Sequence, residues 1–251
     1  MSRVYLDYNA TTPLSAEARA AMQDAMDVVG NPSSVHAEGR AAKMLVERAR
    51  VQVATLVGCK PTQVIFTGSA TEAAALAVAQ KARHGGAFHA LPTEHDCFLA
   101  WDEGDSASGG LVARSAANSE TGVIAGVQTG ANVVCDITQM AGKMQIELLE
   151  DACPAYMVLS AHKLGGPKGV GALINFTSED PEAILRGGGQ EMGRRSGTEN
   201  VIGIAGFGAA AEVAHQMVAH GAWTRVAELR NILENALEAA SNKTIFVGKE
   251  S

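Results

Sequence analysis

Short apolar runs alternate along the chain with longer segments in which apolar residues recur at helical spacing. The runs are bounded by polar or glycine-containing turns, as is typical of buried strands. The predicted strands cover residues 4–6, 64–67, 87–91, 110–114, 132–136, 156–159, 170–176 and 244–247. The predicted helices cover about 15–29, 35–57, 69–83, 199–219 and 222–241. Strands that alternate with helices predict an α/β fold, with a mostly parallel sheet that is covered on both faces.

Local signals mark the ends of several helices. Ser15 is a candidate N-cap with Glu17 in the first turn, and Gly58 closes the second helix. Ser69-Ala-Thr-Glu72 matches a capping box, so a helix is expected to begin there. The last two helices carry apolar stripes: Ala205, Ala209, Val213 and Met217 in the first, and Val226, Leu229, Leu233 and Leu237 in the second.

A glycine motif within the predicted helix 199–219 needs a separate explanation. Gly206-Phe-Gly-Ala-Ala-Ala211 fits the G-x-G-x-x-A pattern of dinucleotide-binding folds. That motif requires a strand directly before it, whereas these glycines lie inside a helical stripe. Close packing between helices is therefore the better interpretation.

The composition is that of an ordinary globular protein. The 251 residues are 47% hydrophobic and 19% charged, which allows one large domain or somewhat more. The formal net charge of −7 argues against general nucleic-acid binding, which requires a basic surface. No signal peptide and no membrane-spanning segment is recognised, so the expected location is cytoplasmic. The cysteines at 59, 97, 135 and 153 lack the spacing of metal ligands and are expected to be thiols.

A lysine at the end of a predicted strand is the strongest candidate for chemistry. The apolar run 156–159 stops at Ser160, and a polar turn then carries His162 and Lys163. Open α/β sheets bind ligands at the carboxyl ends of their strands. A solvated loop lysine is the simpler interpretation. The neighbouring hydroxyl and imidazole groups favour instead a lysine that forms a Schiff base with an aldehyde cofactor, pyridoxal 5'-phosphate (PLP) above all.

Other predicted strand ends offer the remaining parts of a PLP site. Asp136 ends a strand and suits a protonated ring nitrogen, and Gln139 follows three residues later. The turn Gly68-Ser-Ala-Thr71 opens a helix, whose amides and positive dipole end suit a phosphate. His95 could stack on the ring, and Asn118 could donate to its phenolic oxygen. Asp136 as a helix N-cap and His95 as a structural histidine are the alternative explanations.

A series of motifs in fixed order connects these residues. They are Tyr5-Leu-Asp-Tyr-Asn-Ala-Thr-Thr-Pro13, Asn31-Pro-Ser-Ser-Val-His36, Phe66-Thr-Gly-Ser-Ala-Thr-Glu72, Thr93-Glu-His95, Asn118-Ser-Glu-Thr-Gly122, Asp136 with Gln139, Ser160-Ala-His-Lys163, and Arg186-Gly-Gly-Gly-Gln190 through Arg195-Ser-Gly-Thr-Glu-Asn200. Together they resemble those of cysteine desulfurases of the NifS/IscS type, within the class V aminotransferase family of fold-type I PLP enzymes. The resemblance covers nearly the whole chain.

The resemblance implies a role for each candidate residue around the cofactor ring. Lys163 is the Schiff-base lysine, and His95 stacks on the ring; these two are the expected catalytic residues. Asp136 and Gln139 address the ring nitrogen and the phenolic oxygen. Asn118 lies near the ring and the substrate.

The resemblance also implies how the cofactor phosphate is held. Its expected ligands within one chain are Ala70, Thr71, Ser160 and His162. Thr198 corresponds to a residue that reaches the phosphate of a partner subunit, so a homodimer is expected. The segment 186–200 supports this expectation, because it is rich in glycine and arginine rather than typical of a core element.

The fold implied by the resemblance is the large domain of a fold-type I PLP-dependent transferase. It has a mostly parallel sheet of the seven-stranded type between helices, and the small C-terminal domain is expected to be largely missing here. The expected division is an N-terminal segment at 1–14, a PLP-binding large domain at 15–220, and the start of a truncated small domain at 221–251.

The implied reaction takes sulfur from L-cysteine, leaving alanine. The sulfur passes as an enzyme persulfide to a sulfur-acceptor protein, for iron–sulfur cluster or thio-cofactor synthesis. The chain ends before the family's sulfur-accepting cysteine loop and carboxylate-binding arginine, so no turnover is expected from these residues alone. Cys97 is the only cysteine near the predicted site. Two alternatives stay open: another class V reaction, either transamination or β-elimination, and a PLP-binding fragment without catalysis.

Overall fold

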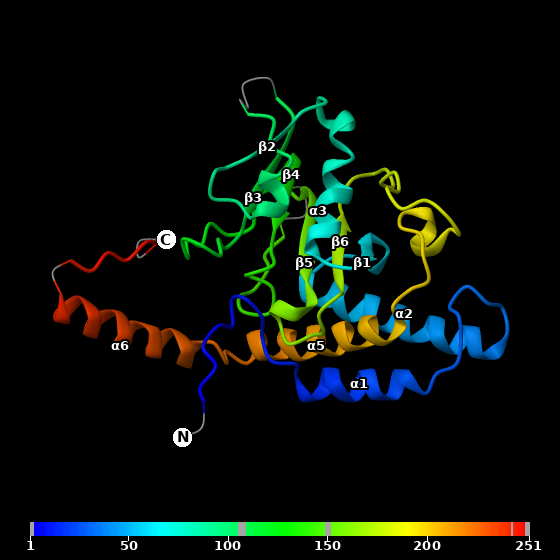
Figure 1. Cartoon of the computed structure of the whole chain (residues 1–251), viewed down its shortest axis with the longest axis horizontal. Coiled ribbons are helices and arrows are strands. Elements are labelled where there is room, and N and C mark those ends of the chain that lie inside the picture. Colours follow the sequence, from blue (N-terminus) through cyan, green and yellow to red (C-terminus); the bar gives the residue numbers. More distant parts are fainter. Residues whose placement is uncertain (1–2, 105–108, 149–151, 242, 249–251) are drawn as a thin grey trace.

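The computed structural model describes residues 3–104, 109–148, 152–241 and 243–248, which form a central sheet flanked by helices (Figure 1). The strands are β1 (Val64–Thr67), β2 (Phe88–Ala90), β3 (Leu111–Ser115), β4 (Gly130–Asp136), β5 (Pro154–Ser160) and β6 (Gly171–Asn175). They lie in the order β1-β6-β5-β4-β3-β2. Strands β2 to β5 are parallel to one another, whereas β6 is antiparallel to β5 and β1. The described chain thus holds a mixed sheet of six strands, not the seven expected.

Helices cover both faces of this sheet, as predicted. They are α1 (Ala16–Met26), α2 (Ala37–Val57), α3 (Ala70–Val78), α4 (Asp96–Leu99), α5 (Val201–Ala219) and α6 (Thr224–Ala240). Helices α2 and α5 pack together on one face, and α1 packs against α5 (Figure 1). Helices α3 and α4 pack on the other face. The α/β architecture is that of the predicted fold class.

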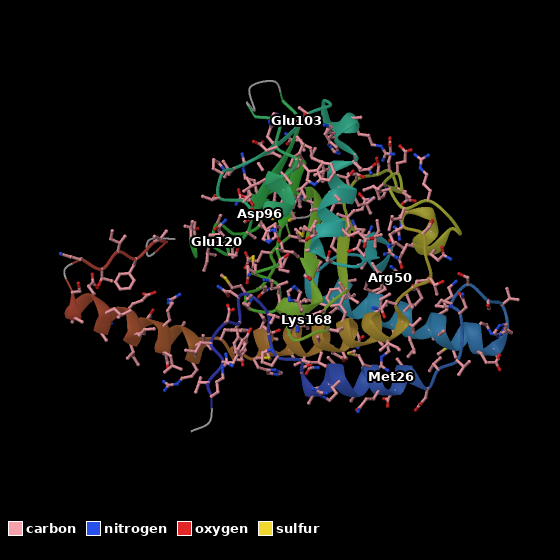
Figure 2. The ribbon with its side chains drawn as sticks, in the orientation of Figure 1. Met26, Arg50, Asp96, Glu103, Glu120 and Lys168 are labelled. Atoms are coloured by element: carbon pink, nitrogen blue, oxygen red, sulfur yellow. The ribbon has the colours of Figure 1, made fainter. Side chains whose placement is uncertain are left out.

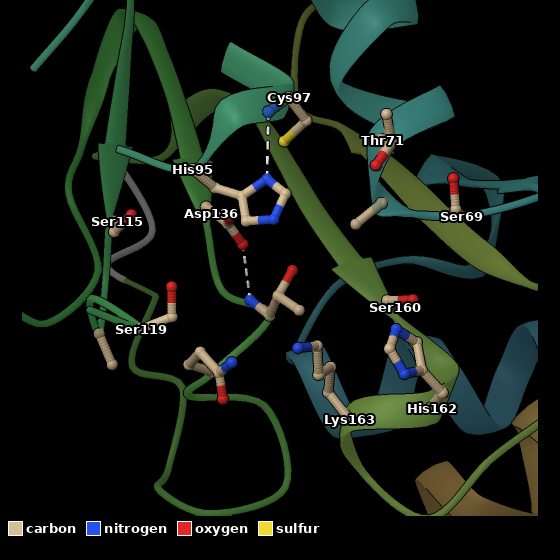
Figure 3. Close-up of a pocket in the computed structure, with 14 residues that line it drawn as sticks. Ser69, Thr71, His95, Cys97, Ser115, Ser119, Asp136, Ser160, His162 and Lys163 are labelled. Atoms are coloured by element: carbon tan, nitrogen blue, oxygen red, sulfur yellow. Dashed lines mark hydrogen bonds between the residues drawn. The ribbon is translucent and has the colours of Figure 1, made fainter. Parts of the chain in front are cut away.

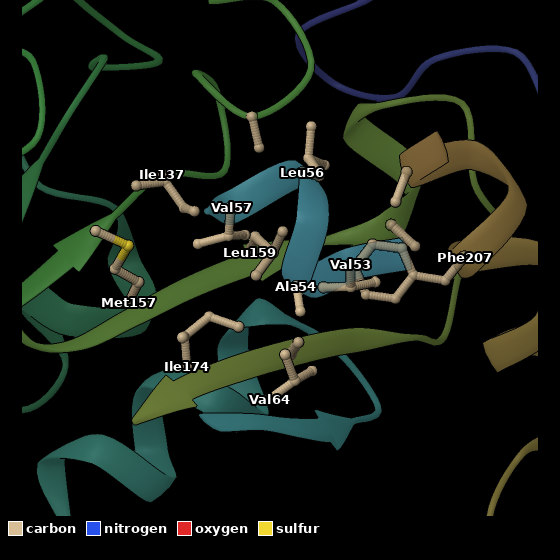
Figure 4. Packing of buried hydrophobic residues seen from close by; sticks show 14 of the residues in the cluster. Val53, Ala54, Leu56, Val57, Val64, Ile137, Met157, Leu159, Ile174 and Phe207 are labelled. Carbon is tan, nitrogen blue, oxygen red and sulfur yellow. The ribbon is translucent and has the colours of Figure 1, made fainter. Parts of the chain in front are cut away.

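The hydrophobic core lies in two clusters, one on each face of the sheet. Because successive side chains of a strand point to opposite faces, Leu159 of β5 joins the cluster under α2 and α5, and Val158 joins the cluster under α3. Figure 4 shows the first cluster, in which Phe207 of α5 and Val53 of α2 gather near Leu159. Strand β5 is buried along its whole length, which explains its continuous apolar sequence.

The predicted helix starts are confirmed at the level of individual hydrogen bonds. The Ser15 and Ser69 hydroxyl oxygens each accept a bond of 3.1 Å from the amide three residues later. Gly58 ends α2 in the left-handed conformation, with φ of 79°. Two helices end earlier than predicted, α1 at Met26 and α3 at Val78.

The glycines of the dinucleotide-like motif allow close packing between helices, as predicted from the sequence. A Cβ atom at Gly206 would lie 2.6 Å from Met22 Cγ on α1. A Cβ atom at Gly208 would lie 2.5 Å from the backbone Cα of Ala49 on α2. Both distances are too short for a side chain, so these glycines let α5 lie close against both helices.

The predicted apolar stripe on α5 is displaced from the face that is buried in the core. The residues that join the core cluster are Ile204, Phe207, Ala211 and Ala214, whereas Met217 of the predicted stripe is 41% exposed. The helix is apolar on most sides, so its periodicity does not identify one face. It is also long and apolar enough to cross a membrane, contrary to the prediction of no such segment. In this fold it is a core helix, because it packs against α1 and α2.

Three other predicted elements differ from the structure. The segments 4–6 and 244–247 are not strands. Leu6 and Ile245 are each 85% exposed, and a short apolar run without a neighbouring strand has no partner for its backbone groups. The stripe predicted on α6 exists in sequence, but no residue of that helix is buried.

A buried ion pair fixes the segment 186–200 to the sheet. The Arg50 guanidinium on α2 donates two bonds of 2.8 Å to the Glu191 carboxylate, which also accepts the amide of Phe66 on β1 at 3.0 Å. Figure 2 shows where Arg50 lies on its helix. Glu191 adopts a left-handed conformation with φ of 50°, which this bonding holds in place. The segment therefore contributes a buried anchor, contrary to the expectation that it is not part of the core.

Candidate active site

A pocket lies where the parallel strands end (Figure 3). Its empty volume is about 580 Å³, which includes space open to solvent. Strands β3, β4 and β5 contribute their last residues, and α3 contributes its first turn. The lining residues are Ser69, Ala70, Thr71, His95, Cys97, Ser115, Ala117, Ser119, Asp136, Thr138, Gln139, Ser160, His162 and Lys163. This position agrees with the rule that open α/β sheets bind ligands at the carboxyl ends of their strands.

Eight of the ten predicted site residues line this one pocket. They are Ala70, Thr71, His95, Asp136, Gln139, Ser160, His162 and Lys163. The other two lie outside it. The Asn118 side chain donates 2.6 Å to the Thr93 carbonyl and accepts from the Thr121 amide at 2.9 Å, while its neighbours Ala117 and Ser119 line the pocket. Thr198 lines an adjacent pocket beside Gly68.

Asp136 is a buried acid at the end of β4. Burial raises the pKa of its carboxyl group, and the nearby charge of Glu94 raises it as well. The hydrogen bond from the Thr138 amide, 2.8 Å to Oδ1, acts in the opposite direction. A cationic group in the pocket would therefore be stabilised strongly by the ionised form of this side chain.

Lys163 ends a short 3-10 turn, Ala161–Lys163, that continues directly from β5. Its ammonium group donates to the backbone carbonyl of Asn9. Burial lowers the pKa of Lys163, and the carboxylates of Asp136 and Asp7 oppose this effect without reversing it. A lowered pKa increases the share of neutral amine, the form that attacks an aldehyde.

An N-terminal segment, residues 5–13, is hydrogen-bonded to the turn that carries His162 and Lys163. The His162 carbonyl accepts the Thr12 amide at 2.9 Å and the Thr12 hydroxyl at 2.9 Å. The His162 ring Nδ1 lies 3.1 Å from Thr11 Oγ1. Burial lowers the pKa of His162, and the positive charges of Lys163 and Lys168 lower it further. The sequence motif marks this segment, but nothing local in it predicts these contacts.

His95 and Cys97 stand at the start of α4. His95 is the N-cap, and its Nδ1 accepts the Cys97 amide at 3.1 Å, so the second ring nitrogen remains for other partners. Burial raises the pKa of the Cys97 thiol to about 12. The thiol is thus protonated at neutral pH and is a poor nucleophile. This environment supports the expectation that Cys97 is not the sulfur acceptor.

The first turn of α3 offers an anion site. The Glu72 amide donates to Ser69 Oγ. Ala70 and Thr71 line the pocket in the first turn of the helix, where backbone amides have no acceptor within the helix. The Glu72 carboxylate accepts the Gly68 amide at 2.7 Å and pairs with the Arg195 guanidinium at 2.7 Å. The pairing offsets a negative charge that would otherwise oppose an anion at this helix end.

Sequence reasoning missed several pocket residues. Ser69, Ser115, Ala117, Ser119 and Thr138 line the pocket without having been assigned to it, although Ser69 lies in the predicted phosphate turn. Ser115 was identifiable in principle, because it directly follows the predicted strand 110–114. The same holds for Thr138, which lies in the turn between two predicted site residues.

These residues together match the requirements of a PLP site. The pocket has a half-buried amine, a buried carboxyl group, an imidazole and a helix start with hydroxyl groups beside it. Each has a counterpart on the cofactor: the aldehyde, the ring nitrogen, the ring face and the phosphate. The donor set present is therefore compatible with PLP.

Known proteins similar to this chain are cysteine desulfurases. The chain is 37% identical to one from Frankia sp. (strain EuIK1), over 86% of this chain and 63% of that protein. It is 34% identical to one from Klebsiella pneumoniae, over 99% of this chain and 71% of that protein. The chain thus spans about two thirds of the length of these relatives.

Solved structures give the same relationship. The NifS-like protein from Rickettsia africae superposes with a TM-score of 0.86 at 27% identity, covering 99% of this chain and 78% of that one. A protein named SspA, solved in complex with cysteine, superposes with a TM-score of 0.72 at 26% identity, covering 84% and 72%. The family profile of class-V aminotransferases matches residues 4–125 and 107–251. This chain belongs to the aminotransferase class-V family.

Proposed function

We propose that this chain binds PLP and forms the cofactor site of a cysteine desulfurase, which removes sulfur from L-cysteine and leaves alanine. The observation that carries the proposal is the convergence of Lys163, Asp136 and the first turn of α3 on one pocket. The names of the relatives support the reaction, and the cysteine complex of SspA supports the substrate. No observation on this chain favours transamination or β-elimination over desulfuration.

Each part of the cofactor has residues suited to hold it. Lys163 would bind the aldehyde carbon through its Nζ, and Asp136 would pair with the protonated ring nitrogen. The amides and hydroxyl of Ala70 and Thr71, together with Ser160 and His162, would bind the phosphate. His95 would lie on the ring, Gln139 would donate to the phenolic oxygen, and Asn118 would lie near the ring and the substrate. When bound, PLP supplies an electron-withdrawing ring that stabilises negative charge at the substrate Cα.

Lys163 has a second task in the proposed reaction. Once the substrate amine has taken its place, its neutral Nζ is free to remove the proton from the substrate Cα and to return it during alanine formation. The lowered pKa of Lys163 favours the neutral form that this transfer needs. Burial raises the pKa of Asp136, so a positive charge beside it favours its ionised form, and the ionised form would in turn favour a protonated ring nitrogen.

Covalent labelling tests the proposal directly. The purified chain, incubated with PLP and reduced with borohydride, should carry the cofactor on the peptide containing Lys163. Lys143 and Lys168 are internal controls, because one lies close to Lys163 and the other is exposed five residues further on. A label on either control lysine, or no label on a correctly folded chain, would contradict the assignment.

Assembly and location are further parts of the proposal. Thr198 lies beside Gly68 at the phosphate turn but outside the pocket, a position suited to a residue that completes the site of a partner subunit. A homodimer in the cytoplasm is therefore proposed, with the sulfur passed to an acceptor protein for iron–sulfur cluster or thio-cofactor synthesis. The domain division at 14 and 220 belongs to the same proposal.

A further inference from the structure

We propose that Lys143 is a positioning residue of this pocket, which orients the side-chain amide of Gln139 and places a second positive charge beside Lys163. The proposal rests on the proposed function, because Lys163 is the cofactor lysine only under that function. Lys143 itself does not line the pocket. It acts through two residues that do.

Hydrogen bonds fix the orientation of Gln139. The Lys143 ammonium donates to the Gln139 backbone carbonyl at 3.1 Å and to its side-chain Oε1 at 3.2 Å. An ammonium group has only donors, so it must face the oxygen of the amide and not its nitrogen. The amide nitrogen Nε2 consequently points the other way and donates 3.0 Å to the Asn9 carbonyl. Gln139 is thereby held with its amide nitrogen toward Asn9, whose carbonyl also accepts from the pocket residue Lys163. A nitrogen donor in this orientation is what a phenolic oxygen requires.

The same bonds bring two ammonium groups near each other. The Asn9 carbonyl that accepts from Gln139 also accepts from the Lys163 ammonium. Lys143 and Lys163 are therefore separated by one side-chain amide and one peptide carbonyl. Burial lowers the pKa of Lys143 to about 8, with the charge of Lys163 as a second cause. Lys143 nevertheless stays mostly protonated at pH 7, since its pKa remains above that value.

Other charged groups around the two amines set the balance. Asp136 at the end of β4 and Asp7 on the N-terminal segment favour the ammonium form of Lys163. Lys143 opposes both, because a neighbouring positive charge favours the neutral amine. His162 adds little charge at neutral pH, since its own pKa is lowered. Burial is the largest cause that lowers the pKa of Lys163. The positive charge of Lys143 acts in the same direction wherever Lys143 is itself protonated.

Competitive labelling in the absence of cofactor measures this effect. Trace acetic anhydride reacts only with neutral amines, so the rate of Lys163 acetylation against pH reports the pKa of Lys163. Three variants separate charge from hydrogen bonding: Lys143→Arg keeps both, Lys143→Gln keeps a donor without charge, and Lys143→Met removes both. Lys168→Gln is the control, because it removes one positive charge from an exposed lysine in the same region.

The expected result is that Lys143→Gln and Lys143→Met slow Lys163 acetylation at pH 7, where Lys143 is mostly protonated, by roughly threefold or more, whereas Lys143→Arg and Lys168→Gln stay near the wild-type rate. Unchanged labelling in Lys143→Gln, or equal slowing in Lys143→Arg, overturns the charge role. In ¹⁵N spectra the Gln139 side-chain amide protons should be shifted from the positions of an exposed glutamine and slow to exchange with solvent in the wild type, and should move to the exposed positions with faster exchange in Lys143→Met. Unchanged amide signals in Lys143→Met overturn the orienting role.

The labelling also separates this inference from the proposed function. Neither measurement uses PLP, so both report on Lys143 alone. A positive result with no PLP on Lys163 would retain the inference about the two lysines and reject the cofactor assignment. A negative result with PLP on Lys163 would do the reverse.

Discussion

Asp136 is a carboxyl group in a buried position at the end of β4, and its pKa is raised mainly by that burial. Burying an ionised carboxyl group costs free energy, so a purely structural role as a helix cap does not explain its position. The Asp136 Oδ1 accepts the Thr138 amide, but no helix begins directly after Asp136 in the described chain, so the prediction of a helix N-cap is wrong and the bond closes a turn instead. Bonding to the backbone and pairing with a cation are compatible, because Oδ1 accepts the Thr138 amide while the negative charge of the carboxylate can still attract a cation in the pocket.

Replacing Asp136 by Asn should reveal this balance through the pH dependence of stability. A raised pKa in the folded state means that the carboxyl stabilises the fold fully only below its unfolded pKa. That stability is lost as pH rises through the folded pKa, at about 1.4 kcal/mol for each unit by which the pKa is raised. The cofactor-free Asp136→Asn variant keeps an oxygen for Thr138 and has no charge to bury.

We therefore expect the free energy of unfolding of Asp136→Asn, relative to the wild type, to rise between pH 4 and pH 8. Urea titrations of both proteins without cofactor measure it. The same variant should bind PLP more weakly, because the ring nitrogen loses its anionic partner. A constant difference in unfolding free energy across this range would show that the carboxyl is not destabilised by burial.

At the scale of elements, the segment 186–200 combines exposed glycines with one deeply buried acid. The Glu191 side chain is 2% exposed and the Arg50 side chain is 5% exposed. A buried pair is costly to desolvate, so its value lies in fixing one arrangement of the segment against β1. This anchor places Arg195 where it pairs with Glu72 at the start of α3. The anion site of α3 is thus connected to a segment more than 100 residues away.

Glu191→Gln should destabilise the fold by about 3–5 kcal/mol, because it removes the buried anionic partner of Arg50 and leaves the half-exposed Glu47 carboxylate, 3.2 Å from Nε, as the remaining one. Glu182→Gln is the matched control, since its partner Arg186 is 76% exposed. The control should change the unfolding free energy by less than about 0.5 kcal/mol. Urea denaturation of both variants measures the difference. Equal effects would show that burial of the Glu191 pair has no special consequence.

The elements predictable from sequence are those with strong local signals. Serine caps at α1 and α3, the closing Gly58 and the buried apolar runs of the sheet each determine structure within a few residues. The segments 4–6 and 244–247 were predicted as strands because an apolar run looks the same with or without a neighbouring strand. The buried face of α5 was predicted wrongly, because the apolar residues of a helix that is apolar on most sides do not mark one face.

At the scale of the whole molecule, the site was predictable where its residues end strands or start helices. Asp136, Ser160 and Lys163 follow apolar runs, and parallel strands bring such residues to one edge. The bonds that join Asn9 to Lys163 and Gln139 were not predictable, because they connect residues 154 and 130 positions apart without any local signal. Lys143 was missed for another reason: its contact with Gln139 spans only four positions, but Lys143 neither ends a strand nor starts a helix, so no sequence signal marked it.

Thr198 raises the question of assembly, because it is exposed and lies outside the pocket that its predicted role concerns. Under the proposed function this hydroxyl binds the phosphate of a second chain. We expect the chain to sediment as a dimer, and we expect Thr198→Ala to remain a dimer that loses PLP about tenfold more readily. That factor corresponds to one hydrogen bond to a charged group, at about 1.5 kcal/mol.

Thr55→Ala is the control for this change, because Thr55 is an exposed threonine on α2 whose hydroxyl bonds only to the Val51 carbonyl of its own helix. Sedimentation velocity and PLP retention during dialysis should distinguish the two variants. Equal retention by both, in a chain that sediments as a monomer with full PLP occupancy, would mean that each chain completes its own site. The phosphate would then be held by α3, Ser160 and His162 without a partner subunit.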